Sequence, residues 1–119
     1  MEKVERKTYK ESRPWGGFSQ FTHNQLSTVK ILEVKSGQMN SLQYHHNREE
    51  LWVPLDNNSS VTVGDKTFKV SKFEEVFIGK EQNHRLIGSG EESGFVMEIS
   101  FGNFDENDIV RVEDSYGRA

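Results

Sequence analysis

The residues with the clearest potential for chemistry lie in the segment SLQYHHNREELW, residues 41–52. Alternate side chains of a β-strand share a face, so a strand here would point Gln43 and His45 to the same side. Glu50 follows five residues after His45, and a short turn can return its carboxylate to the same pocket. His84, in EQNHRLIG, is the natural fourth ligand from a distant strand. This combination of imidazoles, a carboxylate and an amide oxygen indicates a site for one divalent metal ion.

The ligand types narrow the choice of metal. The sequence contains no cysteine, which excludes thiolate ligands, disulfides and thiol nucleophiles. Zn²⁺ is our first expectation for a mixed nitrogen and oxygen site, with Mn²⁺, Fe²⁺, Co²⁺ or Ni²⁺ as alternatives. The competing interpretation is a solvated strand end without metal, because adjacent histidines on a strand face opposite ways. We expect His46 to face away from the metal, as a surface residue or as support for the ligands.

The elements that must position these residues have the pattern of β-strands. The segment TVKILEV places Lys30, Leu32 and Val34 on one face, and GFVMEISF alternates in the same way from Phe95 to Phe101. SVTVGDKTFKV has the form of two strands joined at Gly64-Asp65. Short strands separated by turn signals, with almost no helical periodicity, predict an all-β sandwich or barrel, of which a jelly roll is one closure.

Length and composition bound the organisation of the chain. Its 119 residues fit a single domain, and no repeat or linker divides them. Residues 1–12 are strongly charged and could form a flexible arm or an edge strand that pairs with a second subunit. Because jelly rolls with exposed edge strands often pair, we expect a homodimer.

The same composition excludes several classes of partner. The sequence has no apolar run that could span a membrane and no apolar stretch near its start that could act as a secretion signal, so we expect a cytoplasmic protein without a membrane partner. A net charge of −4 argues against a nucleic-acid partner, although clustered Arg and Lys could still hold a phosphate group.

The spacing of the candidate ligands resembles the first motif of the cupin superfamily. Gly37, Gln43, His45, Glu50 and Asn57 follow its intervals, with Gln43 in place of the first histidine and Asn57 in place of the closing glycine. The second cupin motif is less complete. His84 stands at its histidine, whereas other residue types occupy its proline, glycine and asparagine positions, namely Gly79, Glu81 and Gly88.

Three separated segments narrow this resemblance. RPWGGF at 13–18, NSLQYHHNREELW at 40–52 and DIVRVEDSYGR at 108–118 together resemble the type II mannose-6-phosphate isomerase family, the cupin domain usually fused behind mannose-1-phosphate guanylyltransferase. The resemblance implies a single stand-alone cupin jelly-roll barrel over residues 1–119. It also implies that Gln43, His45, Glu50 and His84 hold a divalent metal. No nucleotidyltransferase domain accompanies these segments, so guanylyltransferase activity is not implied.

The implied reaction interconverts mannose 6-phosphate and fructose 6-phosphate through a cis-enediol. It requires a base, an electrophile that a metal can provide, and cations for the phosphate. Lys30 is the first catalytic candidate, because an inward lysine beside a metal could exchange protons. The alternative is that Lys30 faces solvent and Ile31 faces inward.

Arginines are the candidates for binding the phosphate, since their guanidinium groups form paired hydrogen bonds with it. Arg48 could clamp phosphate or pair with Glu49, and Arg13 could enter the pocket while the neighbouring Pro14-Trp15 closes the barrel end. We assign Arg111 to catalysis and Arg118 to substrate binding. Both could instead join an ion-pair network with Asp108, Glu113 and Asp114 that pins the C-terminal tail, and Tyr116 could bind substrate or only pack.

The preferred function is therefore a metal-dependent isomerase of sugar phosphates, with mannose 6-phosphate as its substrate. Two alternatives stay open. One is another sugar-phosphate or nucleotide-sugar isomerase or epimerase on the same scaffold, and the other is a metal- or sugar-binding cupin module without turnover.

Overall fold

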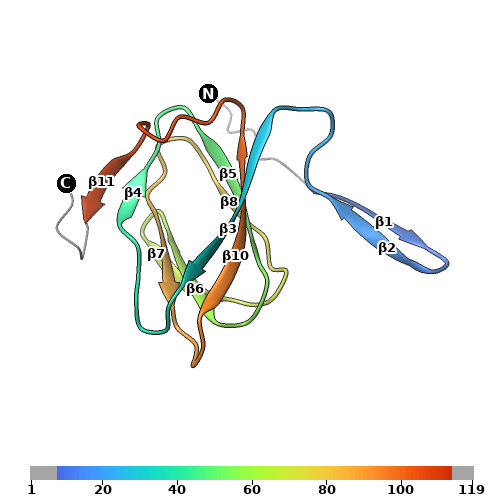
Figure 1. Ribbon diagram of the computed structural model, residues 1–119, viewed down its shortest axis with the longest axis horizontal. Coiled ribbons are helices and arrows are strands. Elements are labelled where there is room, and N and C mark those ends of the chain that lie inside the picture. The colour runs from blue at the N-terminus through green and yellow to red at the C-terminus, as the bar shows by residue number, and fades with distance from the viewer. Residues whose placement is uncertain (1–7, 114–119) are drawn as a thin grey trace.

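Two antiparallel β-sheets face each other in the body of the protein, which a computed structural model describes for residues 8–113 (Figure 1). The first sheet has the strand order β3 (Ser27–Val34), β10 (Gly94–Phe101), β5 (Glu49–Pro54) and β8 (Val76–Ile78). The second has the order β11 (Val110–Glu113), β4 (Leu42–Tyr44), β9 (His84–Gly88), β6 (Ser59–Val63) and β7 (Lys66–Val70). A separate hairpin of β1 (Tyr9–Arg13) and β2 (Gly16–Gln20) projects from the body. The predicted all-β class is confirmed.

The main core lies between the two sheets, where alternate side chains of both point inward. Trp52 of the first sheet and Leu86 of the second are almost fully buried there. The remaining buried members of this core are Val34, Val61, Val70, Val76, Ile78 and Val96. Burying each such side chain contributes about 1.5–3 kcal/mol, so this layer holds the two sheets together.

The register of β3 and β10 decides which face of each strand is inward. Lys30 lies opposite Glu98, and Glu98 lies opposite Trp52 of β5, so these three residues share the inner face. Ile31 is 64% exposed on the outer face. The predicted inward face of β3 is therefore confirmed, and the alternative with Ile31 inward is wrong.

A second apolar cluster covers the outer face of the first sheet. Its buried members are Leu51, Val53, Ile99 and Phe101, and Phe21, from the segment between β2 and β3, packs against them. The apolar series predicted in GFVMEISF thus belongs to this outer cluster, while Val96, Glu98 and Ser100 face inward.

Gly64 and Asn57 differ in their backbone conformation. Gly64 has a φ of 65° in the β6–β7 hairpin, a left-handed conformation that glycine adopts without strain. Asparagine can adopt the same conformation. Asn57 does not, because it is not among the positive-φ residues of the described chain. Its side-chain oxygen instead accepts a hydrogen bond from the backbone N–H of Lys72 at 2.8 Å.

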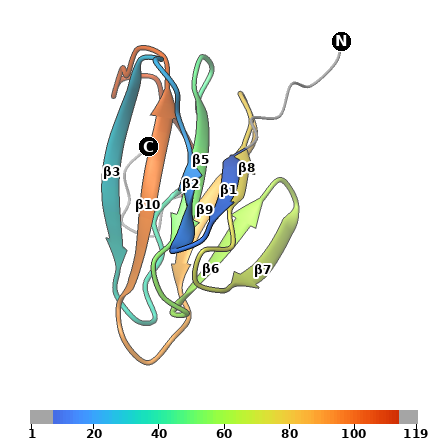
Figure 2. The ribbon, with the colours of Figure 1, turned by 90° about the vertical axis from the view of Figure 1, so that its right-hand side faces the viewer.

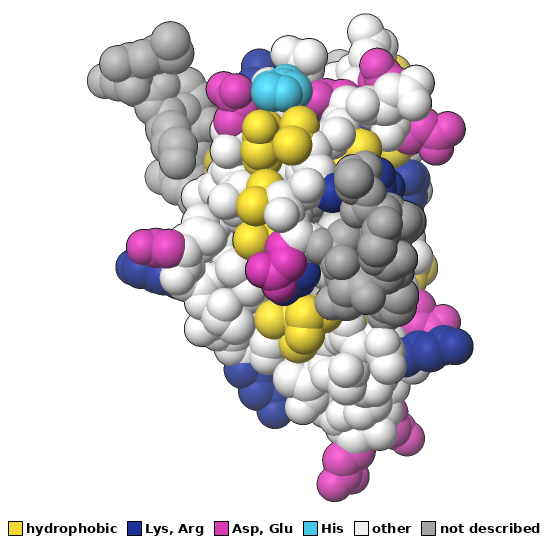
Figure 3. Space-filling model, turned by 90° about the vertical axis from the view of Figure 1, so that its left-hand side faces the viewer, with side chains coloured by type: hydrophobic (Ala, Val, Ile, Leu, Met, Phe, Trp, Pro, Cys, Tyr) yellow, Lys and Arg dark blue, Asp and Glu magenta, His cyan; other side chains and the backbone are white. Residues whose placement is uncertain are grey.

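Strand pairing in the N-terminal segment begins at Tyr9 and continues to Gln20, so the projecting element extends beyond the predicted arm of residues 1–12. The RPWGG segment forms its turn. On the opposite side of the molecule, over β4 and β11, hydrophobic side chains form only a narrow column among polar and charged ones (Figure 3). No helix is present among residues 8–113, and hence none there is long and apolar enough to cross a membrane.

Candidate metal centre

Three predicted ligands meet between the sheets. His45, Glu50 and His84 each offer a ligand atom, and these atoms lie within 4.8 Å of one another. Glu50 Oε2 is 3.6 Å from His45 Nε2, and Glu50 Oε1 is 3.7 Å from His84 Nε2. All three side chains are buried. They come from the start of β5, the start of β9 and the turn after β4, so the two sheets together build the cluster.

The hydrogen bonds of the two imidazoles aim them at the same point. His45 Nδ1 donates to the backbone carbonyl of Asp108 at 2.6 Å, and His84 Nδ1 donates to that of Gln82 at 3.0 Å. Such bonds fix the tautomer in which Nε2 carries the lone pair, as in many metal sites. Among the described residues His84 Nε2 is buried without a hydrogen-bond partner. A buried imidazole nitrogen without a partner, aimed at a carboxylate, fits a metal ligand.

The protonation states agree with that role. Burial lowers the pKa of His84 to about 4 and also lowers the pKa of His45. Both imidazoles are therefore neutral near pH 7, which is the form that binds metal. Burial raises the pKa of Glu50, whereas the Arg48 guanidinium opposes this shift. Glu50 accepts hydrogen bonds from Arg48 Nε at 2.9 Å and Trp52 Nε1 at 3.1 Å, which hold its carboxylate in place.

The incomplete second motif still shapes the loop before His84. Glu81, at the motif's glycine position, has a φ of 61°, which is the left-handed conformation that glycine would adopt. Its backbone N–H donates to the carbonyl of His45 at 2.7 Å, which links the loop to the other imidazole. At Gly88 a Cβ atom would collide with the backbone oxygen of Lys35, so a side chain here would require the backbone to shift.

A family model described as mannose-6-phosphate isomerase C-terminal matches residues 1–114. The chain belongs to this family. It is 37% identical over 114 residues to xanthan biosynthesis protein XanB of Xanthomonas campestris, covering 95% of this chain and 24% of that protein. The chain spans about a quarter of the length of the curated relatives it matches.

Solved structures agree on the fold. The capsular polysaccharide assembling protein CapF of Staphylococcus aureus superposes with a TM-score of 0.68 at 18% identity, over 90% of this chain and 34% of that one. A Klebsiella pneumoniae protein with a double-stranded β-helix domain superposes with a TM-score of 0.65 at 17% identity, over 77% and 78% of the two chains. The predicted cupin jelly roll is thereby confirmed.

Gln43, the remaining predicted ligand of this mannose-6-phosphate isomerase C-terminal domain, lies in register with His84 across β4 and β9. Cross-strand neighbours share a face, so Gln43 points toward the same interior. Its Oε1 accepts a hydrogen bond from Ser41 Oγ at 2.6 Å and keeps a second lone pair. Gln43 as the fourth ligand stays a prediction.

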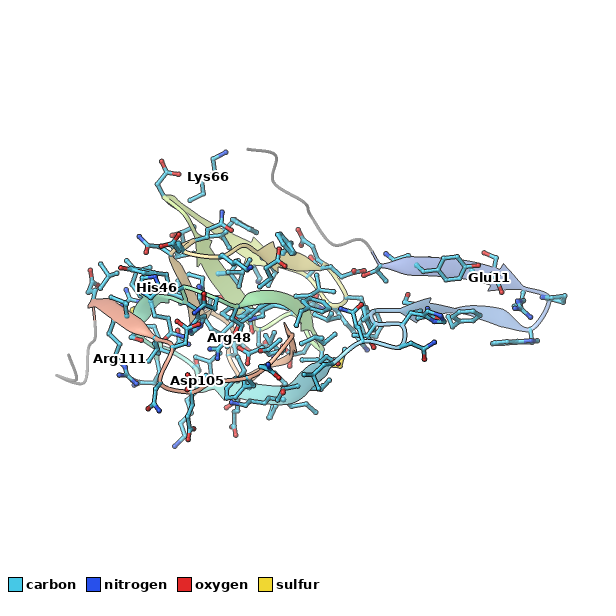
Figure 4. All side chains as sticks on the ribbon, turned by 90° about the horizontal axis from the view of Figure 1, so that it is seen from above. Glu11, His46, Arg48, Lys66, Asp105 and Arg111 are labelled. Atoms are coloured by element: carbon cyan, nitrogen blue, oxygen red, sulfur yellow. The ribbon has the colours of Figure 1, made fainter. Side chains whose placement is uncertain are left out.

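Two cations predicted to act on substrate converge beside the cluster. Lys30 is exposed at its rim, and its Nζ lies 4.0 Å from the ring centroid of Phe104. The guanidinium carbon of Arg48 lies 4.4 Å from the same centroid. Arg48 Nε donates a hydrogen bond to Glu50, and Arg48 Nη2 lies 2.9 Å from His45 Nε2. Figure 4 shows Arg48 near Asp105, in the segment that carries Phe104.

Sequence reasoning missed Glu98, which is 8% exposed and lies opposite Lys30. Burial raises its pKa to about 7, the Glu50 carboxylate raises it too, and the cations of Arg48 and Lys30 oppose the shift. The only signal in the sequence was a carboxylate within the mostly apolar stretch GFVMEISF. Perturbed carboxyl groups of this kind are concentrated at functional sites.

Arg111 of β11 lies in register with Gln43 of β4, so the two residues are cross-strand neighbours in the second sheet. Arg111 Nε is buried without a hydrogen-bond partner among the described residues. Of the residues in the alternative ion-pair network, Glu113 pairs with Arg85 at 3.0 Å, and Asp114 and Arg118 lie outside the described residues. Asp108 instead accepts hydrogen bonds from the backbone N–H groups of His46 and Asn47.

Of the other predicted substrate residues, Arg13 belongs to the described chain, and it is not brought to this centre. Arg13 lies on the projecting hairpin, where it pairs with Glu11. Figure 4 shows Glu11 on this hairpin, away from Arg48. Tyr116 and Arg118 lie outside the described residues. His46 takes the predicted outward position, with its Nδ1 3.2 Å from Glu81 Oε2 at the surface.

Proposed function

We propose that this domain is a metal-dependent isomerase that interconverts mannose 6-phosphate and fructose 6-phosphate. The observation that carries the proposal is His84 Nε2, a buried nitrogen without a described partner, aimed at Glu50 beside His45. A purely structural histidine in such a core would be expected to use both ring nitrogens in hydrogen bonds.

His45, Glu50 and His84 would hold the ion, with Gln43 as the fourth ligand. A divalent ion bound there would supply electrophilic polarisation of the sugar's carbonyl and adjacent hydroxyl oxygens. Zn²⁺ is our first proposal for its identity, followed by Mn²⁺, Fe²⁺, Co²⁺ and Ni²⁺.

Lys30 is proposed as the residue that moves the proton. In the direction from aldose to ketose, a proton leaves C2 and is delivered to C1, while the hydroxyl proton on O2 is lost and O1 gains one. The Lys30 side chain would relay the C2 proton to C1 on the same face of the enediol. Glu98, directly opposite, would position Lys30 through its charge.

Phosphate recognition is assigned to Arg48, which directly precedes β5, and to Arg111 of β11, for which we propose this role in place of the catalytic one expected from the sequence. Arg111 also has a buried Nε without a described partner, so binding an anion would satisfy a polar atom that is otherwise unpaired. We retain Arg13, Tyr116 and Arg118 as proposed substrate residues. Arg13 lies on the hairpin, and Tyr116 and Arg118 belong to the part of the chain that the structure does not describe.

One observation favours a second candidate, a metal- or sugar-binding module without turnover. Arg48 Nη2 lies against His45 Nε2, so a bound ion requires this guanidinium to turn aside, and Phe104 occupies the space beside both cations. If neither group moves, the centre could hold a ligand without admitting a substrate to Lys30.

The deciding experiment offers the metal-loaded protein a panel of sugar phosphates and follows each by product analysis. Our proposal predicts turnover of mannose 6-phosphate to fructose 6-phosphate. Conversion of a different sugar phosphate would show that mannose 6-phosphate is not the substrate. Full metal occupancy without turnover of any sugar phosphate in the panel would support the binding module.

A further inference from the structure

The segment between β10 and β11 crosses the end of the barrel at which β3 begins and β10 ends (Figures 1 and 2). It carries Phe104, whose ring lies against two cations of the candidate centre. The ring centroid is 4.0 Å from Lys30 Nζ and 4.4 Å from the guanidinium carbon of Arg48. A cation within about 6 Å of an aromatic centroid is attracted to the ring, so Phe104 binds both groups.

Phe104 is not a residue of the apolar core. Its side chain is half-buried, and it is not a member of either apolar cluster of the described chain. The residues on either side of it, Asn103 and Asp105, are exposed. Contacts with the two cations, rather than burial among apolar side chains, therefore account for the position of the ring.

Both ends of the segment are anchored to neighbouring parts of the fold. At the first end, the backbone N–H of Gly102 donates a hydrogen bond to the carbonyl of Leu26 at 2.9 Å. At the second end, the carboxylate of Asp108 accepts a hydrogen bond from the backbone N–H of His46 at 2.8 Å. These anchors flank residues 103–107, which can change position while the ends stay in place.

A backbone contact ties the same residues to Arg48. The carbonyl of Asp105 accepts a hydrogen bond from Arg48 Nη1 at 3.3 Å. A displacement of residues 103–107 would release this N–H group together with the faces of both cations that the Phe104 ring covers. Arg48 and Lys30 are the groups that we assign to the phosphate and to proton transfer, so the same displacement would make both available to a substrate.

We propose that Phe104 covers the substrate site and is displaced when a sugar phosphate binds. This inference rests on the proposed function, because that function assigns Arg48 to the phosphate. A phosphate group forms charge-assisted hydrogen bonds with a guanidinium, which are stronger than the attraction of a neutral ring. The free energy needed to displace the ring lowers the apparent affinity of any anion that binds there.

Calorimetry with inorganic phosphate measures that effect without any turnover. Phe104→Leu removes the aromatic face, so it should bind phosphate about 5- to 30-fold more tightly than wild type, because two cation–π contacts no longer have to be broken. Phe104→Tyr keeps the aromatic face and should bind phosphate within about twofold of wild type. Elemental analysis should confirm equal metal content in all samples, so that any contact between phosphate and metal contributes equally.

The β7–β8 connection offers a matched control. Phe73 lies there beside the ammonium of Lys72, with 5.1 Å from Nζ to the ring centroid. Phe73→Leu also removes a cation–π contact, but from a segment that supplies none of the candidate ligands. This variant should bind phosphate as wild type does.

Tryptophan fluorescence follows the movement of the ring itself. In Phe104→Trp the indole keeps an aromatic face toward the cations, and saturating phosphate should shift its emission to longer wavelength as it moves into water. Wild type, which contains Trp15 and Trp52, provides the background.

Three results would each overturn the proposal. These are phosphate binding by Phe104→Leu that is no tighter than that of wild type, an equal gain in Phe104→Tyr, and unchanged emission of Phe104→Trp at saturating phosphate. Absence of mannose 6-phosphate turnover would remove the proposed isomerase activity but would not alter these binding measurements, so the two failures are distinguishable.

Discussion

Lys30 and Glu98 face each other directly across β3 and β10, on the inner face of the sheet that also carries Glu50. The pair places a cation beside a carboxyl group whose pKa is raised to about 7, chiefly by burial. Two groups able to exchange protons thus lie next to three potential metal ligands.

Replacing the amine of Lys30 should separate catalysis from metal binding. Lys30→Met should lower kcat by about 10²–10⁴-fold, the usual contribution of a general acid or base, and leave the metal content unchanged. Steady-state kinetics and elemental analysis of the same sample test this. Lys66→Met, on β7 and far from the centre in Figure 4, is the control. Activity of Lys30→Met within twofold of wild type would remove Lys30 from the mechanism.

Glu98 gives metal-free protein a pH-dependent stability. Between its ordinary pKa of 4.5 and its folded value of about 7, the folded state retains a proton that the unfolded chain has lost. The free energy of unfolding therefore falls as pH rises through this window, and above pH 7 the penalty is complete at about 3 kcal/mol.

Glu98→Gln abolishes that titration, so the variant should gain stability over wild type as pH rises from about 5 to about 8. Urea unfolding in the presence of a chelator measures the difference at each pH. Glu92→Gln, in the exposed β9–β10 connection, controls for a general effect of net charge. A stability difference for Glu98→Gln that does not change with pH would contradict the assignment.

Arg111 should matter for the phosphate more than for the chemistry. Arg111→Ala removes a charged hydrogen-bond donor, and since such bonds contribute about 1.5–3 kcal/mol, KM for the sugar phosphate should rise about 10- to 150-fold. The inhibition constant of inorganic phosphate should rise in parallel, and Arg111→Lys should lie between the two because it keeps the charge. If kcat falls while phosphate inhibition is unaltered, Arg111 does not bind the phosphate.

The backbone of Glu81 allows a test of the incomplete second motif. A residue with a side chain at φ 61° is strained by about 1 kcal/mol, and glycine relieves that strain. Glu81→Gly should therefore unfold at higher urea concentration than Glu81→Ala, the control that removes the same contact with His46. Equal or greater stability of the alanine variant would show that this loop carries no such strain.

Alternation and spacing predicted much of this centre from the sequence. They placed Lys30 inward and separated His45 from His46, because side chains on a strand obey a strict period of two. The same rule could have paired Arg48 with Glu50, since residues two apart share a face while Glu49 points away. Glu49 is the immediate neighbour of Arg48 in the sequence and is therefore the more obvious partner when the fold is unknown.

Other features depend on tertiary packing that no local pattern encodes. The strand GFVMEISF is fully apolar on the face that lies outside the barrel. Its alternation therefore identifies that face and gives no indication that Glu98, on the other face, points into the barrel. The RPWGG turn indicated a tight reversal but not that the hairpin would project and keep Arg13 from the centre. Those outcomes depend on how distant strands pair.

The most direct test of the proposed centre compares metal content and isomerase rate in the wild type, His84→Ala and His23→Ala. His23 is an exposed histidine that contacts Gln20 and Asn24 and serves as the control. We predict one divalent ion per chain and mannose 6-phosphate isomerisation in the wild type and in His23→Ala, and loss of both in His84→Ala. Full metal content and full rate in His84→Ala would contradict the proposal.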